Sequence, residues 1–253
     1  MLELLPEGVL LWAAGTLVAV SYFTSAFTAA FGIGGGLFML VRIASLVPPL
    51  AIIPLHGLVQ IGSNAGRAAV MRQHISYRPF ALLTIGGVVG VVIASQIVVA
   101  LPQSWLRLIL GVFVVWAVWG PKPKSASIGD LGYAIAGAAA SFATMFVGAT
   151  GPLIAAFISP DRFSKNATVA THAATMTLQH TLKIIAFGVL GFAFMDWLPL
   201  VAAMIATGFL GTLTGRYMLE RIPEIWFKRI FKTALTLLAA RLIIVAVMGL
   251  LGY

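Results

Sequence analysis

The residues whose types and spacing could do chemistry lie in the stretch PLHGLVQIGSNAGR, residues 54–67. Polar side chains recur there at i, i+4, i+7, i+8 and i+11, namely His56, Gln60, Ser63, Asn64 and Arg67. A helix places all five on one stripe. Imidazole, amide, hydroxyl and guanidinium groups are hydrogen-bond donors, and two of these types also carry positive charge. The stripe therefore has the chemistry of an anion site.

A second stretch repeats the pattern 116 residues further along the chain. ATHAATMTLQHTLK, residues 170–183, aligns without a gap and pairs His56 with His172 and Arg67 with Lys183. Gln179 and His180 align with the Ser63–Asn64 pair. Two stripes in matching positions predict two walls of one site.

The sequence around both stripes is that of a membrane protein. It is 60% hydrophobic, contains only seven carboxylates in 253 residues, and has a mean hydropathy of +1.04. Its apolar runs of about 20 residues match the hydrocarbon core of a bilayer. The net charge of +9 is therefore interpreted as charge on cytoplasmic loops, and not as a nucleic-acid surface. The absence of cysteine excludes disulfides and thiolate metal sites.

The whole chain divides into two copies. A shift of 116 residues aligns FGIGGGLF (31–38) with VGATGPLI (147–154). A shift of 121 residues aligns GGVVG (86–90) with GFLG (208–211), and LPQSW (101–105) with IPEIW (222–226). The expected organisation is a first membrane repeat over 1–120, a basic cytoplasmic linker over 121–127 and a second membrane repeat over 128–253, which together form one transport domain.

Each copy predicts a long helix, a glycine-rich break, a short segment and three long helices. The expected ranges are 8–31, 34–48, 50–73, 78–100 and 104–120 in the first copy, and 128–148, 150–160, 164–189, 197–219 and 224–252 in the second. Proline ends the short segments, because it lacks a backbone donor and clashes with the preceding turn. The fold class is an all-α polytopic membrane protein with about ten membrane segments, two of them short or broken.

Loop charge predicts that the two copies are inverted. The loop 72–78 is basic and its counterpart 190–197 is not, whereas 216–232 is basic and its counterpart 101–105 is not. If basic loops face the cytoplasm, each copy crosses the membrane an odd number of times. Ten crossings with both termini outside satisfy this pattern, which is the inverted-repeat plan of secondary transporters. A re-entrant hairpin in place of the short segments is the competing topology.

The glycine-rich breaks add backbone donors to the expected site, because a helix that begins at a break leaves its first N–H groups free. Close helix packing is the alternative role for these glycines. The predicted substrate-binding residues are Gly34, Gly35, Gly36, His56, Gln60, Asn64, Thr150, Gly151, His172, Gln179 and His180. Arg67 and Lys183 are the expected entrance residues of the path. Imidazole titrates near neutral pH, so the histidines could also couple transport to protons.

Carboxylate placement excludes several other functions. All seven acidic residues fall near predicted helix ends or loops, so no carboxylate within the membrane can bind sodium or a divalent cation. An anion is therefore favoured, with no metal and no cofactor. A zinc hydrolase built on the histidines lacks an HExxH motif and a nearby general base. A passive anion channel on the same repeat remains the alternative to a carrier.

GIGGGLFMLV, its copy GATGPLIAAF, and the runs KNATVATHAATMT and IPEIWFKRIFK resemble the sulfite exporter TauE/SafE family over essentially the whole chain. The resemblance implies a secondary transporter, and by the family's usual sense an exporter, of sulfite, a small sulfonate or a related anion. It also implies a multi-pass protein of the bacterial inner membrane. The expected partners are a small sulfur-containing anion and the lipid bilayer, and a homodimer stays open.

Overall fold

The structure is a computed structural model of the 253-residue chain, and it describes residues 5–6, 8–31, 35–98, 102–120, 129–158, 162–219 and 224–251. These residues form helices joined by short connections, with no strand among them, which confirms the all-helical prediction. The α-helices are α1 (Leu11–Phe31), α2 (Gly35–Leu46), α3 (Pro49–Val70), α4 (Tyr77–Val98), α5 (Gln103–Trp119), α6 (Asp130–Val147), α7 (Gly151–Phe157), α8 (Lys165–Val189), α9 (Leu198–Leu219) and α10 (Glu224–Leu250). Two 3-10 turns, η2 (Arg72–His74) and η3 (Met195–Trp197), lie before α4 and α9. The expected linker 121–127 lies outside the described residues.

The helices belong to two compact units, and each unit draws on both halves of the chain. Unit 1 consists of residues 1–56, 101–121 and 193–253, and unit 2 consists of 57–100 and 122–192. The helix α3 begins in unit 1, and from Gly57 onward its residues belong to unit 2. Sequence repeats and compact units therefore divide the chain differently.

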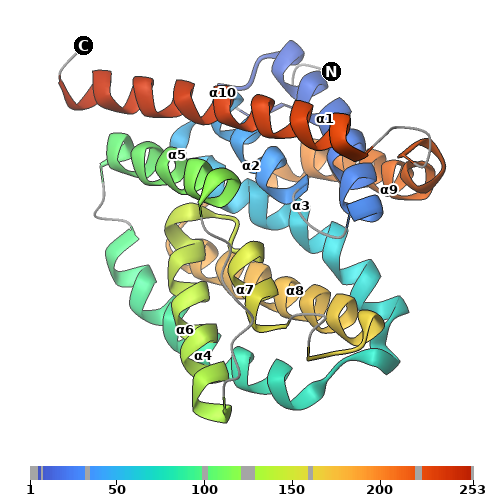
Figure 1. Ribbon diagram of the computed structural model, residues 1–253. Helices are drawn as coiled ribbons and strands as arrows, with labels where there is room; N and C mark the ends of the chain where they lie inside the picture. Colours follow the sequence, from blue (N-terminus) through green and yellow to red (C-terminus); the bar gives the residue numbers. More distant parts are fainter. Residues whose placement is uncertain are drawn as a thin grey trace. The chain divides into compact units, whose positions relative to one another are not determined.

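In unit 1, α1 packs along α9, and the two helices run parallel (Figure 1). Ser21 donates from Oγ to the carbonyl oxygen of Met204 at 2.6 Å. One turn further along both helices, Gly208 lies against Ser25, where a Cβ atom added to the glycine would be 2.8 Å from the serine Oγ. Because both residue numbers rise together from one contact to the next, the helices share a direction.

Also in unit 1, α5 and α10 lie side by side and run antiparallel, as Figure 1 shows. Gly249 near the end of α10 lies against Ser104 at the start of α5. At the other end of the pair, the Trp119 indole donates from Nε1 to Oγ1 of Thr236 at 2.8 Å. Because the residue numbers rise along α5 while those of the contacting residues fall along α10, the two helices run in opposite directions.

In unit 2, α4 and α6 form an extensive parallel pair held by close approach of their backbones. A Cβ atom added to Gly86, Gly90 or Gly137 would overlap with a carbonyl group of the facing helix. Such contacts need a residue without a side chain, and they recur where membrane helices pack closely. At the exposed start of the pair, Arg78 donates to both carboxylate oxygens of Asp130, from Nε at 3.1 Å and from Nη2 at 2.5 Å.

The contacts of these two parallel pairs correspond through the shifts found in the sequence. Gly90 of α4 faces the carbonyl of Ala138 in α6, and Gly211 of α9 faces that of Tyr22 in α1. Tyr22 precedes Ala138 by 116 residues, and Gly90 precedes Gly211 by 121. The Gly87–Ser141 contact corresponds in the same way to that of Gly208 with Ser25. The first helix of each half thus packs on the fourth helix of the other half.

A third pair in unit 2 joins α8 to α4. The backbone N–H of Ser76, just before α4, donates to Oγ1 of Thr171 at 2.9 Å. Eleven residues further along both segments, a Cβ atom added to Gly87 would lie 3.7 Å from the side chain of Leu182. These two contacts show that α4 and α8 run parallel.

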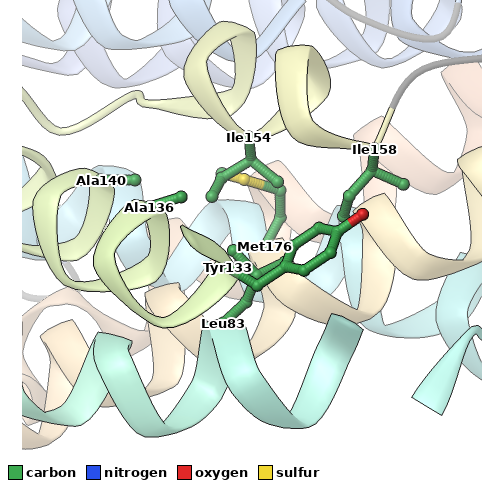
Figure 2. Close-up of a cluster of buried hydrophobic side chains, with 7 residues drawn as sticks. All are labelled: Leu83, Tyr133, Ala136, Ala140, Ile154, Ile158 and Met176. Atoms are coloured by element: carbon green, nitrogen blue, oxygen red, sulfur yellow. The ribbon is translucent and has the colours of Figure 1, made fainter. Parts of the chain in front are cut away.

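The short helix α7 is held in unit 2 by a cluster of buried apolar side chains (Figure 2). Ile154 and Ile158 point from α7 and its C-terminal end into the cluster. The cluster consists of Leu83, Tyr133, Ala136, Ala140, Ile154, Ile158 and Met176, from α4, α6, α7 and α8. Burial of this apolar surface fixes a helix that is too short to be stable alone.

Of the described helices, four are long and apolar enough to cross a membrane by length and composition, and they cover Leu11–Thr28, Tyr77–Val98, Asp130–Val147 and Met195–Thr214. Shorter apolar helices occur at Gly35–Leu46, Ser104–Trp116 and Ala239–Leu250. The helices that carry the two polar stripes, α3 and α8, are in neither set. Polar residues along one face lower the hydropathy of both.

Candidate functional site

The candidate site in unit 2 begins where α6 ends and the chain turns into α7. Gly148 ends α6 with a backbone φ of 83°, in the left-handed region that glycine adopts without a steric penalty. Its N–H donates to the carbonyl of Thr144 at 2.9 Å, and its own carbonyl accepts a hydrogen bond from Thr144 Oγ1 at 3.2 Å. The break is thus a defined turn with an inward carbonyl group.

Lys183 reaches this turn from α8. Its ammonium group donates from Nζ to the Gly148 carbonyl oxygen at 2.9 Å, and the residue is 0% exposed. The aliphatic part of the side chain passes Gly57 of α3, where an added Cβ atom would lie 2.9 Å from Lys183 Cε. Gly57 therefore leaves the space through which the lysine side chain reaches the turn.

Gln179, one turn before Lys183, connects three helical segments through its buried amide. Its Oε1 accepts a hydrogen bond from Thr150 Oγ1 at 3.2 Å, and its Nε2 donates to Ser141 Oγ at 3.0 Å. All three residues are buried. The amide links α6, α8 and the residue that caps α7, so these donors and acceptors are held in fixed positions.

His172, two turns before Gln179, contacts the start of α7. Its Nε2 lies 3.1 Å from the carbonyl oxygen of Gly151. Since a carbonyl only accepts, the ring nitrogen carries the hydrogen. In unit 1, His56 Nε2 lies 2.9 Å from the carbonyl oxygen of Gly36 in the first turn of α2. Aligned histidines thus hold the first turn of the short helix in each half.

The remaining predicted residues lie in different settings. Gly34 lies outside the described residues, and Gly35 is packed against the backbone of Thr24 in α1. The Gln60 carbonyl accepts a hydrogen bond from Asn64 Nδ2 at 2.9 Å, which is a contact along α3.

His180 is buried on α8, and Arg67 is half-buried on α3. Arg67 lies close enough to His172 to act on it electrostatically. Unit 2 therefore brings Arg67, Thr150, Gly151, His172, Gln179 and Lys183 into its interior or next to it, whereas Gly35, Gly36 and His56 belong to unit 1.

The electrostatics of unit 2 favour negative ligands. Its two carboxylates are Asp130, which pairs with Arg78 at an exposed position, and Asp161, which lies outside the described residues. Among the described residues of unit 2, Lys183 is thus a buried cation without a carboxylate partner. An uncompensated buried charge is unfavourable, and an anion would compensate it.

Three residues at the break were not predicted as site residues. The Ser141 hydroxyl accepts a hydrogen bond from Gln179, the Gly148 carbonyl accepts one from Lys183, and the Thr144 hydroxyl donates to that same Gly148 carbonyl. The spacing of Ser141 and Thr144 by three residues on an otherwise apolar helix was a usable signal, because it places both hydroxyls on one face.

The apolar helices, four of them long enough to cross a membrane, define a helical membrane protein with a buried polar network in unit 2. The chain belongs to the sulfite exporter TauE/SafE family, whose family model matches residues 17–242. Membership implies that the protein is a membrane transporter of sulfite-type anions. Comparison with curated proteins and with solved structures gives no significant match.

Proposed function

We propose that the protein is a secondary transporter that exports a sulfur-containing anion, such as sulfite or a small sulfonate, by alternating access. The observation that carries the proposal is the buried ammonium group of Lys183, which lies beside the Gln179 network. The carboxylate that the structure describes in this unit, Asp130, is exposed. The family membership supports the sulfur-containing class of anion.

The chemistry of the site suits an oxyanion of sulfur. Sulfite and sulfonate groups present three oxygens that accept hydrogen bonds. The ammonium group of Lys183 and the amide of Gln179, one turn apart on α8, each have an N–H beyond the one already bonded within the protein. In this proposal Lys183 provides the charge and Gln179 orients the oxygens, while Thr150 holds the Gln179 amide in place. Arg67, beside His172, attracts the anion at the cytoplasmic end.

Inverted repeats are part of the proposal, and the α5–α10 pair supports them. The shift of 121 residues makes these two helices equivalent, and they run antiparallel within unit 1. Equivalent helices that both span a membrane in opposite directions belong to copies of opposite orientation. Parallel repeats would require the same direction for both.

Helix directions also support ten crossings. The antiparallel α5–α10 pair and the parallel α4–α8 pair both require that the segment containing α7 crosses the membrane, if the other helices between them cross. The parallel α1–α9 pair then requires that α2 crosses as well. Seven residues of α7 rise by only about 10 Å, so its flanking residues complete that crossing.

Ten crossings place both termini outside, and the basic loops then face the cytoplasm. The proposed location is the bacterial inner membrane, because that is the membrane implied by the family resemblance. The proposed transport domain contains both halves of the chain, since each compact unit is built from helices of both. Protons are the proposed coupling ion, and their proposed carrier is a basic side chain in the interior of the transport domain.

The test is anion binding followed by transport. Thermal unfolding of the detergent-purified protein is measured with sulfite, thiosulfate, ethanesulfonate, sulfate and acetate. A ligand that binds only the folded protein raises the unfolding temperature. We expect one sulfur-containing anion to do so for the wild type, and not for Gln179→Leu, which removes the amide. Equal behaviour of all anions with folded protein contradicts the proposal.

Transport in proteoliposomes then separates a carrier from a passive anion channel. An exchanging carrier shows saturation, and anion loaded inside accelerates uptake of labelled anion from outside. A channel shows neither. We expect saturable counterflow with the anion that stabilises the protein, and its absence would favour the channel.

A further inference from the structure

The Lys183 ammonium group is placed where it can lose its proton when no anion is bound. It is fully buried, and its hydrogen bond goes to a backbone carbonyl, that of Gly148. A neutral amine can make the same hydrogen bond as a donor, without the unfavourable burial of a charge. The geometry at the turn therefore accommodates both protonation states.

No described carboxylate of unit 2 is positioned to hold this lysine in its charged form. Asp130 is bonded to Arg78 at an exposed site. Asp161 lies outside the described residues. The carbonyl end of α6 contributes only the partial negative charge of a helix terminus. Among the groups that the structure describes around the Lys183 amine, none carries a full negative charge, so a bound anion would supply it.

Few other titratable groups face this position from the elements packed around it. The α6–α7 turn carries none between Ser141 and Gly151. On α8, His180 lies one turn before Lys183, and His172 contacts the Gly151 carbonyl at the far end of the turn. The helix α3 carries His56 and Arg67 on either side of Gly57 in sequence, and α4 begins with Tyr77 and Arg78, of which the arginine is bonded to Asp130.

We propose that Lys183 is the proton carrier of the transporter: its neutral amine takes up one proton when the anion binds at the α6–α7 turn, and releases that proton when the anion leaves. For a singly charged sulfonate, the proton and the anion together add no net charge to the buried site. The proposal rests on the proposed anion transport and adds the residue that carries the coupling proton, a lysine in place of the histidines expected from the sequence. Outward transport is then driven by the concentration gradients of the anion and of the proton together, and not by membrane potential.

Calorimetric titration of the purified full-length protein tests proton uptake. The probe is ethanesulfonate, which stays ionised over the working pH range, in two buffers that differ in their heat of protonation. We expect uptake of about one proton per anion at alkaline pH, with affinity falling about tenfold per pH unit. Uptake declines toward acid pH, where the amine is protonated before the anion arrives.

Two substitutions separate charge from proton exchange. Lys183→Arg keeps a positive charge that is never released, so it should bind ethanesulfonate with affinity independent of pH and without proton uptake. In proteoliposomes, this variant should make transport respond to an imposed membrane potential, which the wild type does not. Lys183→Met should bind the anion at least tenfold more weakly, at every pH.

The matched control is Lys165→Met, a lysine on the same helix, which should bind ethanesulfonate and take up the proton as the wild type does. His180→Gln and His172→Gln test the histidines as competing carriers, and in each variant the anion that binds should still bring about one proton with it. Thermal unfolding shows that each variant is folded. If the wild type binds ethanesulfonate without proton uptake, or if His180→Gln abolishes uptake, the assignment to Lys183 is wrong while anion transport stands. If neither ethanesulfonate nor any anion of the panel binds, the proposed function fails and this assignment fails with it.

Discussion

His172 lies with its Nε2 atom 3.1 Å from the carbonyl oxygen of Gly151, the first residue of α7. In the other half of the chain His56 makes a similar contact with Gly36, the second residue of α2 and one position beyond the equivalent of Gly151. A side chain that ties a long helix to the first turn of a short one can determine where that short helix begins. The two histidines therefore have a structural role, whatever role they have with the anion.

The histidine contacts predict a moderate loss of stability. His172→Ala and His56→Ala each remove one hydrogen bond from a mostly buried carbonyl, and each should lower the free energy of unfolding by about 1 kcal/mol. The measurement is thermal unfolding in detergent without anion. His74→Ala in the exposed turn η2 is the control and should have no effect. Unchanged unfolding of both variants would mean that these contacts do not hold the short helices.

Gly148 predicts a conformational effect at the break. A residue with a Cβ atom is strained at a φ of 83°, so Gly148→Ala should destabilise the protein by about 1–2 kcal/mol. The turn should also shift, so anion binding should weaken. Gly66→Ala, on an open face of α3, is the matched control, and it should be neutral or stabilising. Normal anion affinity in Gly148→Ala would show that the turn geometry is not required.

Correspondence between the halves predicts paired effects of alanine substitutions. Gly90→Ala and Gly211→Ala both place a methyl group against a backbone carbonyl, and each should destabilise by about 1–3 kcal/mol. The two values should be similar, because the contacts are equivalent. Gly15→Ala has open space and serves as the control. A large effect in one pair and none in the other would argue against equivalent packing.

Opposite orientation of the repeats predicts opposite labelling of corresponding loops. The chain has no cysteine, so single cysteines can be introduced at Gln73 in η2 and at Met195 in η3. A maleimide that cannot cross membranes should label Met195→Cys in intact cells, and Gln73→Cys only after the membrane is opened. Labelling of both from the same side would support the re-entrant alternative.

Helix positions could be predicted from the sequence to within about three residues, because apolar length, proline and glycine breaks are local signals. The break at Gly148 and the short α7 follow from GATGP in the same way. The internal shifts of 116 and 121 residues also anticipate equivalent contacts in the two halves.

Helix partners could not be predicted, because hydropathy says which face is polar but not which helix meets it. Nothing local indicates that Ser21 bonds to Met204, or that Gly90 meets Ala138. Lys183 shows the same limit. An entrance position was expected, yet its long side chain passes Gly57 and ends at a carbonyl inside the protein.

The pairing of α1 with α9 also constrains how the protein is made. Ser21 and its partner Met204 are separated by 183 residues, which a ribosome adds in about 10–40 s at bacterial rates. During that time α1 is in the membrane while the helix that accepts its serine hydroxyl has not been synthesised. A chain that stops before α9 therefore leaves the hydroxyl face of α1 without its native partner.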